Sequence, residues 1–239
     1  MNNKLSIISI LKKRETPRVL TTAMLNGLII YAGVNISIAE FYRFVNDMIS
    51  CRFLFRVKKG LYLNQLADPP SVSDEAAPFL CSGAIISLQR VLGIWGITNN
   101  PSLIVTAVAP VTPGISNPSL GQIKNNAGRF WFHGIASRVL FAGNEKDRIE
   151  QHGRPMPGRM PVATPEKALL DWIYLAGSRH SAISAPSPAD MDMKMINLNR
   201  LFRLAKASGI EKNVKIWLDN SSILLEKKYC HEAEIGMGF

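Results

Sequence analysis

Between residues 37 and 64 the spacing of apolar side chains changes from helical to extended, which restricts what this segment can fold into. In the first half, apolar residues recur every three or four positions: Ile38, Phe41, Val45 and Met48. In the second half they alternate with other residues: Phe53, Phe55 and Val57. The first pattern predicts a helix with one buried face, and the second predicts a strand. Lys59-Gly60 predicts a turn into a second strand over residues 61–64, which completes a hairpin.

The start of the helix is predicted by Ser37 and Glu40. The Ser37 hydroxyl can accept a hydrogen bond from the Glu40 amide while the Glu40 carboxylate accepts from the Ser37 amide, which is a capping box. Two further helices are expected earlier, over residues 6–13 and from Thr21 or Thr22 to about Gly33. Three helices followed by a hairpin predict a winged helix-turn-helix over residues 1–65.

Positive charge is concentrated in this same segment. The chain has 239 residues and a formal net charge of +10. Residues 1–65 contain ten basic and three acidic side chains, a net charge of +7, whereas the remaining 174 residues together carry +3. A basic unit of this kind favours a polyanionic partner, most often nucleic acid. A basic surface with no partner explains the composition equally well.

The predicted layout assigns roles to particular polar side chains. A helix fits the major groove, where short polar residues and an arginine can read base edges, and a hairpin can lie against the phosphates. The residues predicted to bind DNA are Ser37, Arg43, Asn46, Arg56, Lys58 and Lys59. Two structural alternatives stay open: a solvated helix face at Arg43 and Asn46, and protection of an edge strand by the hairpin lysines.

The rest of the chain predicts a second, larger unit. Residues 66–77 contain Pro69-Pro70 and several small polar or acidic residues, which favours an exposed linker. Residues 78–228 alternate strand and helix patterns and predict a mixed α/β domain, and residues 229–239 predict a frayed tail. The expected strands are 79–82, 103–109, 129–135 and 139–142, and the expected helices are 84–92, 166–176, 198–207 and 213–228. The fold class expected for the whole chain is therefore α+β.

Candidates for catalysis are few. His133 lies in an apolar run and is interpreted as a packed strand residue, and Glu166-Lys167 follows Thr164-Pro165 at a predicted helix start. The acidic residues between Glu145 and Glu150 are interpreted as a charged loop. Three scattered cysteines provide no metal-ligand spacing, and no phosphate-binding loop, dinucleotide fingerprint or nucleophile elbow is present. These observations predict a non-enzymatic protein without cofactor or metal.

Membrane insertion and secretion are not expected. No apolar run approaches the roughly 20 residues that a membrane helix needs. The short apolar stretch at residues 5–11 is followed by Lys12-Lys13-Arg14, whereas a signal peptide carries its positive charge before the apolar run. The sequence therefore predicts a cytoplasmic protein with no membrane partner.

Two stretches resemble a known family. The hairpin segment Lys59-Gly60-Leu61-Tyr62-Leu63-Asn64 and the later block from Val162 to Tyr174, which contains Ala-Thr-Pro-Glu-Lys-Ala-Leu-Leu-Asp, resemble the AbiEi family. This family comprises the antitoxins of AbiE-type abortive-infection systems. The block from Val162 to Tyr174 is the more specific of the two, since hairpins of this kind occur in many regulators.

The resemblance implies a type IV antitoxin. Such proteins counteract a nucleotidyltransferase toxin without forming a stable complex with it, and they repress their own promoter by binding inverted repeats of double-stranded DNA. The alternatives that stay open are a transcriptional regulator of the same fold without a toxin partner, a metal-dependent DNA-processing enzyme, and a module whose basic N-terminus binds an acidic protein.

Overall fold

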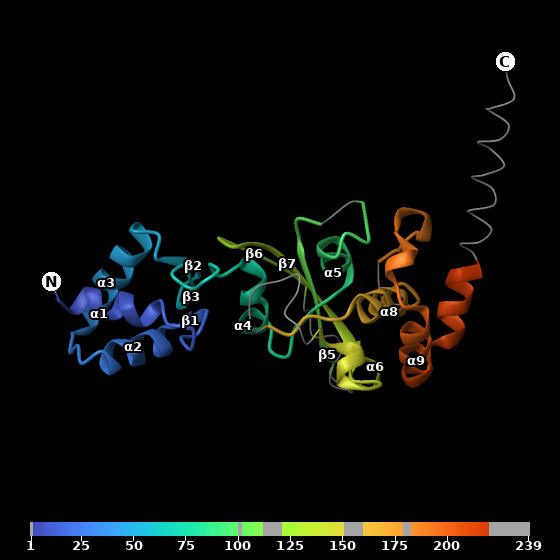
Figure 1. The fold of residues 1–239 in the computed structure, drawn as a ribbon, viewed down its shortest axis with the longest axis horizontal. Helices are drawn as coiled ribbons and strands as arrows, with labels where there is room; N and C mark the ends of the chain where they lie inside the picture. The colour runs from blue at the N-terminus through green and yellow to red at the C-terminus, as the bar shows by residue number, and fades with distance from the viewer. Residues whose placement is uncertain (1, 100–101, 112–120, 151–159, 179–182, 220–239) are drawn as a thin grey trace, which may run out of the picture.

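The first part of the chain is built from three helices and a small sheet (Figure 1). The structure is a computed structural model that describes residues 2–99, 102–111, 121–150, 160–178 and 183–219. The N-terminal unit, residues 2–64, contains in chain order α1 (Asn2–Leu11), β1 (Val19–Thr21), α2 (Thr22–Tyr31), α3 (Ile38–Ser50), β2 (Leu54–Lys58) and β3 (Leu61–Asn64). Its three strands form an antiparallel sheet in the order β1-β3-β2. The strand β1 was not predicted.

Side-chain hydrogen bonds begin two of these helices, as the sequence predicts. The Thr21 hydroxyl accepts from the Met24 amide at 3.2 Å, and α2 begins at the next residue. At α3 the capping box is complete: the Glu40 amide donates to the Ser37 hydroxyl at 3.3 Å, and the Ser37 amide donates to the Glu40 carboxylate at 2.8 Å. These bonds satisfy amides that a helix start leaves without a partner.

Two predicted buried faces need correction. Phe41, Val45 and Met48 are buried as expected, but Ile38, the first residue of α3, is 79% exposed. In the hairpin, Leu54 and Val57 are buried while Phe55 is 39% exposed. A register shift between Arg56 and Lys58 interrupts the strict alternation on which the prediction of one apolar face depended.

The three-stranded sheet lies between two hydrophobic cores. Leu20, Leu54 and Tyr62 pack with helix residues of the N-terminal unit. The alternate positions belong to the larger core of the molecule: Val19, Val57, Leu61 and Leu63. Because side chains along a strand alternate between faces, one short sheet serves both cores.

The larger unit, residues 73–219, is a four-stranded mixed sheet with helices. Its elements are η1 (Ser73–Ala76), α4 (Ala77–Leu80), β4 (Ile85–Ile86), α5 (Leu88–Ile94), β5 (Val105–Val111), β6 (Gln122–Asn125), β7 (Gly128–Ala136), α6 (Ser137–Leu140), α7 (Glu145–Arg148), α8 (Pro165–Ala176), η2 (Pro188–Asp190), η3 (Met193–Met195) and α9 (Leu198–Ser208). The strand order is β4-β5-β7-β6, in which β5 and β7 are parallel and the other pairs are antiparallel. The fold is therefore mixed α+β.

Several predicted elements of this unit are confirmed and two are wrong. The predicted strands at 103–109 and 129–135 correspond to β5 and β7, and the predicted helices at 166–176 and 198–207 correspond to α8 and α9. The predicted helix at 84–92 is confirmed only from Leu88 onward, as α5, because Ile85–Ile86 form the strand β4. The segments 79–82 and 139–142 were predicted as strands, but neither contains a strand, and the helical turns α4 and α6 cover the first half of each. Both segments are short apolar runs, in which residue spacing does not separate a strand from a buried helical turn.

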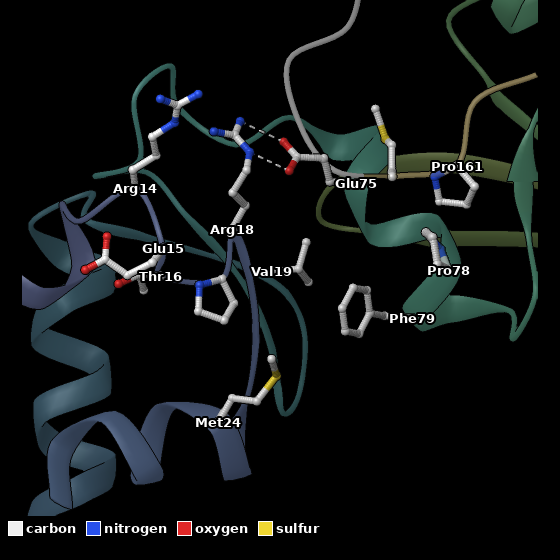
Figure 2. Close-up of a pocket in the computed structure, with 12 residues that line it drawn as sticks. Arg14, Glu15, Thr16, Arg18, Val19, Met24, Glu75, Pro78, Phe79 and Pro161 are labelled. Atoms are coloured by element: carbon white, nitrogen blue, oxygen red, sulfur yellow. Dashed lines mark hydrogen bonds and ion pairs between the residues drawn. The ribbon is translucent and has the colours of Figure 1, made fainter. Parts of the chain in front are cut away.

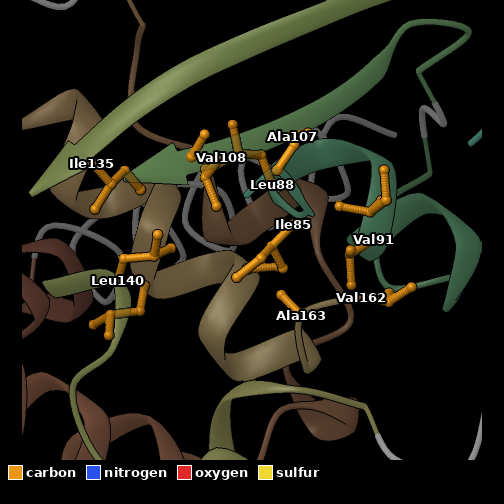
Figure 3. Packing of buried hydrophobic residues seen from close by; sticks show 14 of the residues in the cluster. Ile85, Leu88, Val91, Ala107, Val108, Ile135, Leu140, Val162 and Ala163 are labelled. Carbon is orange, nitrogen blue, oxygen red and sulfur yellow. The ribbon is translucent and has the colours of Figure 1, made fainter. Parts of the chain in front are cut away.

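The core of the larger unit lies between the sheet and its helices (Figure 3). Ala107 and Val108 of β5, Val91 of α5 and Val162, which precedes α8, belong to one buried cluster with Ile135 of β7, which lies on the side of Leu140. The helix α8 begins as predicted, with the Thr164 hydroxyl accepting from the Lys167 amide at 3.3 Å and with proline at the first helical position. All residues from 162 to 171 are buried.

The segment between the two units is not the exposed linker that was predicted. Asp68, Pro69 and Pro70 are exposed, but Ser71 and residues 74–77 are buried. Two ion pairs hold the segment: Arg18 with Glu75 at 2.7 Å and Arg90 with Asp74 at 2.6 Å. Its polar composition predicted exposure to solvent. Instead, its carboxylates are buried and form ion pairs with arginines from both units.

The C-terminal part is described as far as residue 219. After α9, Gly209 adopts a left-handed conformation with φ of 71°, which ends the helix at the predicted position. A further helix covers residues 211–219. The remainder of the predicted helix 213–228 and the predicted tail 229–239 lie outside the described residues. Among the residues that the structure describes, no helix is long and apolar enough to cross a membrane.

Candidate nucleic-acid interface

The outer face of α3 is exposed and polar. Arg43 and Asn46 both lie in solvent on this helix, as predicted. Asp47 on the same face is 3.7 Å from the Lys4 ammonium group of α1. Figure 1 shows α3 at the end of the molecule opposite to α8 and α9. A helix with this exposure can approach a large ligand without first separating from the rest of the chain.

Ser37 is committed to the start of α3. Its hydroxyl both donates to the Glu40 carboxylate at 2.7 Å and accepts from the Glu40 amide. The hydrogen bonds from the Ser37 amide and hydroxyl lower the pKa of the Glu40 carboxyl, and the nearby charge of Arg43 lowers it further. Glu40 is therefore ionised at neutral pH, and it is occupied with the cap, as expected from the sequence.

A hydrogen bond joins α3 to the β2–β3 hairpin. The Arg56 guanidinium donates through Nη2 to the Asn46 side-chain oxygen at 2.7 Å. Arg56 is half-buried, whereas Lys58 and Lys59 are exposed at the turn, where Gly60 has φ of 82°. The structure thus brings two of the predicted residues into direct contact. Arg56, which the sequence predicts to bind phosphate, thus also links the hairpin to α3.

The free edge of β2 is covered by a turn from the larger unit. The backbone nitrogen of Asn126 donates to the Val57 carbonyl at 3.3 Å, and the side-chain nitrogen of Asn126 donates to the Arg56 carbonyl at 3.2 Å. Asn126 belongs to the turn between β6 and β7, so the second hairpin meets the first (Figure 1). Sequence reasoning missed this contact. The only local signal was the Asn-Asn-Ala-Gly turn at residues 125–128.

Glu166 and Lys167, which were considered among the candidates for catalysis, both have structural partners. Glu166 accepts from Arg200 at 3.1 Å and from the Asn197 amide at 2.9 Å. Lys167 is 2% exposed and forms an ion pair with Asp171, which also accepts from the Ser87 hydroxyl at 2.8 Å. Burial raises the pKa of the Asp171 carboxyl, and the attraction of Lys167 opposes that rise. Glu166 and Lys167 have separate partners and do not converge on a common point.

The acidic segment at residues 145–150 is also structural. It was predicted as a charged loop, but Glu145–Arg148 form the helical turn α7 and Asp147 is buried. The Asp147 carboxylate accepts from Arg203 of α9 at 2.9 Å. In the described part of the chain, no group of three or more histidine, cysteine, aspartate or glutamate side chains is placed to hold a metal ion.

His133 is a packed strand residue, consistent with its sequence context. Its ring centroid lies 4.7 Å from that of Trp131 on the same strand. Burial lowers the pKa of its imidazole to about 4, so the ring is neutral near pH 7. The other three histidines, His152, His180 and His231, lie outside the described residues, as does Cys230.

A cavity of about 340 Å³ opens where the N-terminal unit meets α4 (Figure 2). Its wall is mainly apolar and includes Val19, Met24 and Phe79. The Arg18–Glu75 ion pair crosses its upper side in the view of Figure 2. Arg18 and Glu75 are therefore engaged with one another, while Arg14 and Glu15 also line the cavity.

Comparison with known proteins gives similarity in fold alone. No family model matches the sequence, and no curated protein matches it. Among solved structures, the crystal structure of the RV2827C protein from Mycobacterium tuberculosis aligns with a TM-score of 0.51. The alignment covers 89% of this chain and 77% of that one, at 14% sequence identity. The similarity therefore extends over both units.

Proposed function

We propose that residues 1–65 form a winged helix-turn-helix that binds double-stranded DNA and represses the protein's own promoter. One observation carries this proposal. The helix α3 exposes Arg43 and Asn46 and is hydrogen-bonded, through Asn46 and Arg56, to a hairpin whose turn exposes Lys58 and Lys59. The two elements that would contact bases and phosphates are thereby held together in one surface.

The order of elements supports the same interpretation. The N-terminal unit runs α1, β1, α2, α3, β2, β3, so that a helix pair is followed directly by a hairpin. In such a unit the second helix of the pair enters the major groove and the hairpin lies along the neighbouring backbone. Arg43 and Asn46 would then contact base edges, while Lys58 and Lys59 would neutralise phosphates and release counterions.

The larger unit is proposed to provide antitoxin activity. This part of the proposal depends on the resemblance to the AbiEi family, whose sequence block here covers the start of α8. The chain would counteract a nucleotidyltransferase toxin without stable association and without catalysis of its own. A regulator of the same fold without a toxin partner is the alternative, and it makes the same prediction for DNA.

DNA binding is tested by fluorescence anisotropy with the purified full-length chain. The probe is DNA from upstream of the protein's own gene, the control is a scrambled duplex, and both are titrated at two salt concentrations. We expect a cognate preference of several kcal/mol, roughly 4 or more, that persists at the higher salt. Equal and salt-sensitive binding of both duplexes would show that the basic face binds DNA electrostatically and without sequence specificity. Absence of binding would overturn the proposal.

Antitoxin activity requires a separate experiment. A nucleotidyltransferase gene adjacent to this one would be co-expressed with the full chain, with growth as the readout. Equal growth rescue by the wild type and by Arg43→Ala, whose affinity for the promoter is expected to be reduced, would show that antitoxin activity does not depend on promoter binding. If every variant that fails to repress the promoter also fails to rescue growth, the rescue would be explained by promoter binding alone.

A further inference from the structure

A second basic hairpin lies beside the proposed DNA-binding surface. On β6 and β7, Lys124 and Arg129 are directly opposite one another in the antiparallel register, and both are exposed. The turn that joins these strands is the one whose Asn126 is hydrogen-bonded to the carbonyls of Arg56 and Val57. The two cations therefore lie two or three residues from a direct contact with the β2–β3 hairpin.

The pleat of the sheet places both cations on one face. Their neighbours in register, Ile123 and Phe130, point to the opposite face, where Phe130 is fully buried and Ile123 packs against the larger core. Since successive side chains of a strand alternate, Lys124 and Arg129 share the face directed away from that core. Neither side chain is needed to fill the interior, and both are available to a ligand.

Neither of the two hairpins contains an acidic side chain. The sequence has no aspartate or glutamate between Asp47 and Asp68, and none between Glu75 and Glu145. The first interval contains β2 and β3, and the second contains β6 and β7. Cross-strand cations without a carboxylate repel one another unless an anion lies between them. The chemistry of the site therefore fits a polyanion.

We propose that Lys124 and Arg129 bind the phosphate backbone of the DNA beside the segment contacted by α3 and the β2–β3 hairpin. This inference depends on the proposed function. Strands rise about 3.4 Å per residue, so these side chains begin roughly 7–10 Å beyond Asn126 and reach phosphates past those at Lys58 and Lys59. In the view of Figure 1, α3, β2 and the β6–β7 turn lie along one side of the molecule, and α2 and β1 lie along the other.

The contact between the hairpins gives this arrangement its rigidity. Asn126 holds the β6–β7 turn on the edge of β2, and the sheet containing β2 is itself shared by both cores. The spacing between the two cationic groups is therefore set before DNA arrives. A pre-formed spacing reduces the ordering cost of binding, in contrast to a basic segment that becomes ordered on the DNA.

The test compares three double variants of the full chain in the anisotropy assay. Lys124→Gln/Arg129→Gln removes both charges, and Lys124→Arg/Arg129→Lys keeps them. Lys194→Gln/Lys206→Gln removes two exposed charges from η3 and α9, far from the hairpins. We expect the first to weaken binding about tenfold on cognate and scrambled DNA alike, and to reduce the slope of log K against log salt by about two. The second and third are expected to bind as the wild type does.

The outcomes separate this inference from the proposed function. Wild-type affinity and salt slope in the first variant, with Lys58→Ala still reducing both, would overturn the inference and leave the proposed function standing. If the first variant and the distant control lose DNA affinity equally, the loss depends on net charge alone. That result would also overturn the inference. Loss in the charge-keeping variant would show that charge is not what matters. A wild type that binds an acidic polypeptide but no DNA would overturn both proposals.

Discussion

On α8 every charged side chain is buried and paired within the protein, whereas on α3 the charged side chains lie in solvent. Glu166, Lys167 and Asp171 are each less than 4% exposed, and their partners come from α9, α8 itself and the β4–α5 connection. On α3, Arg43 remains exposed next to Asn46. The same residue types thus hold the larger unit together and leave the N-terminal unit with charge available to a ligand.

This contrast explains why the charged residues of α8 are interpreted as structural and those of α3 as available for binding. A buried ion pair offers modest net stability, but loss of one partner is severe because the other charge remains in a low-dielectric interior. An exposed cation contributes little to folding and can contribute its full attraction to an anionic ligand. Substitutions in α8 should therefore affect stability, and substitutions on α3 should affect binding.

The largest expected effect is that of Asp171→Ala. The change leaves the Lys167 ammonium group and the Ser87 hydroxyl buried without their acceptor, so we expect the free energy of unfolding to fall by about 3–5 kcal/mol in urea titrations. Glu211→Ala is the matched control, because Glu211 forms an exposed pair with Lys215 at the same four-residue spacing, and it should have no measurable effect. A Lys167→Met/Asp171→Leu double variant should recover much of the loss. An equal loss of unfolding free energy in Asp171→Ala and Glu211→Ala would contradict the difference between buried and exposed ion pairs.

Arg43→Ala should show the opposite profile. We expect unchanged stability in urea and a loss of about 1–3 kcal/mol in the free energy of binding to cognate DNA, with a smaller loss on scrambled DNA. The comparison of the two duplexes is the measurement. Equal loss on both would exclude base recognition by Arg43.

Ser37→Ala sharpens the comparison because Ser37 is a polar residue of the N-terminal unit that is already used in structure. Loss of the cap should lower the free energy of unfolding by about 1 kcal/mol. Ser37→Asp can still cap the helix, but it places a negative charge near the proposed phosphate contacts. It should retain stability and weaken DNA binding. Full DNA affinity in Ser37→Asp would show that Ser37 lies away from the DNA.

Lys58→Ala should change salt dependence more than specificity. Removing one phosphate contact is expected to reduce the slope of log K against log salt by about one and to weaken cognate and scrambled DNA alike. Lys194→Ala, which removes an exposed charge at the other end of the chain, is the control. An unchanged slope in Lys58→Ala would leave protection of the edge strand as the role of that lysine.

A pH-dependent effect is expected for His133, a half-buried titratable group without an ion-pair partner among the described residues. Its imidazole titrates near pH 4 in the folded chain and near 6.5 when unfolded, so the unfolded state binds the proton first. The contribution of the neutral ring to stability is complete above about pH 6.5 and is lost as the pH falls toward 4. Urea midpoints at pH 7 and pH 5 should differ less in His133→Gln than in the wild type. A difference of the same size would assign the dependence to other groups.

Sequence reasoning was most accurate where a helix start is coded locally. Ser37 with Glu40, and Thr164 with Pro165, predict α3 and α8 because capping groups lie within three residues of the amides they satisfy. The strand β1 has only three residues, and they pair with β3 residues 40 to 44 positions later, so no local pattern marks the strand. The register shift at Arg56 likewise depends on the partner strand.

The candidate site was predicted in part. Arg43, Lys58 and Lys59 are exposed as expected, because charged residues on a helix face or at a turn are usually solvated. The hydrogen bond between Asn46 and Arg56 could be predicted only from the angle between α3 and the β2–β3 hairpin. The contact of Asn126 with Arg56 joins residues about seventy positions apart. Contacts at such separation depend on how units pack, which one sequence without its fold does not reveal.

The sheet shared by two cores has a consequence for modularity. Many DNA readers can be exchanged between proteins because each has a closed core of its own. Here Val19, Val57, Leu61 and Leu63 are covered by the larger unit, so residues 1–65 transplanted alone would carry an uncovered apolar face into the new host. Exchange of the N-terminal unit, in evolution or by engineering, would require another apolar surface to cover these residues.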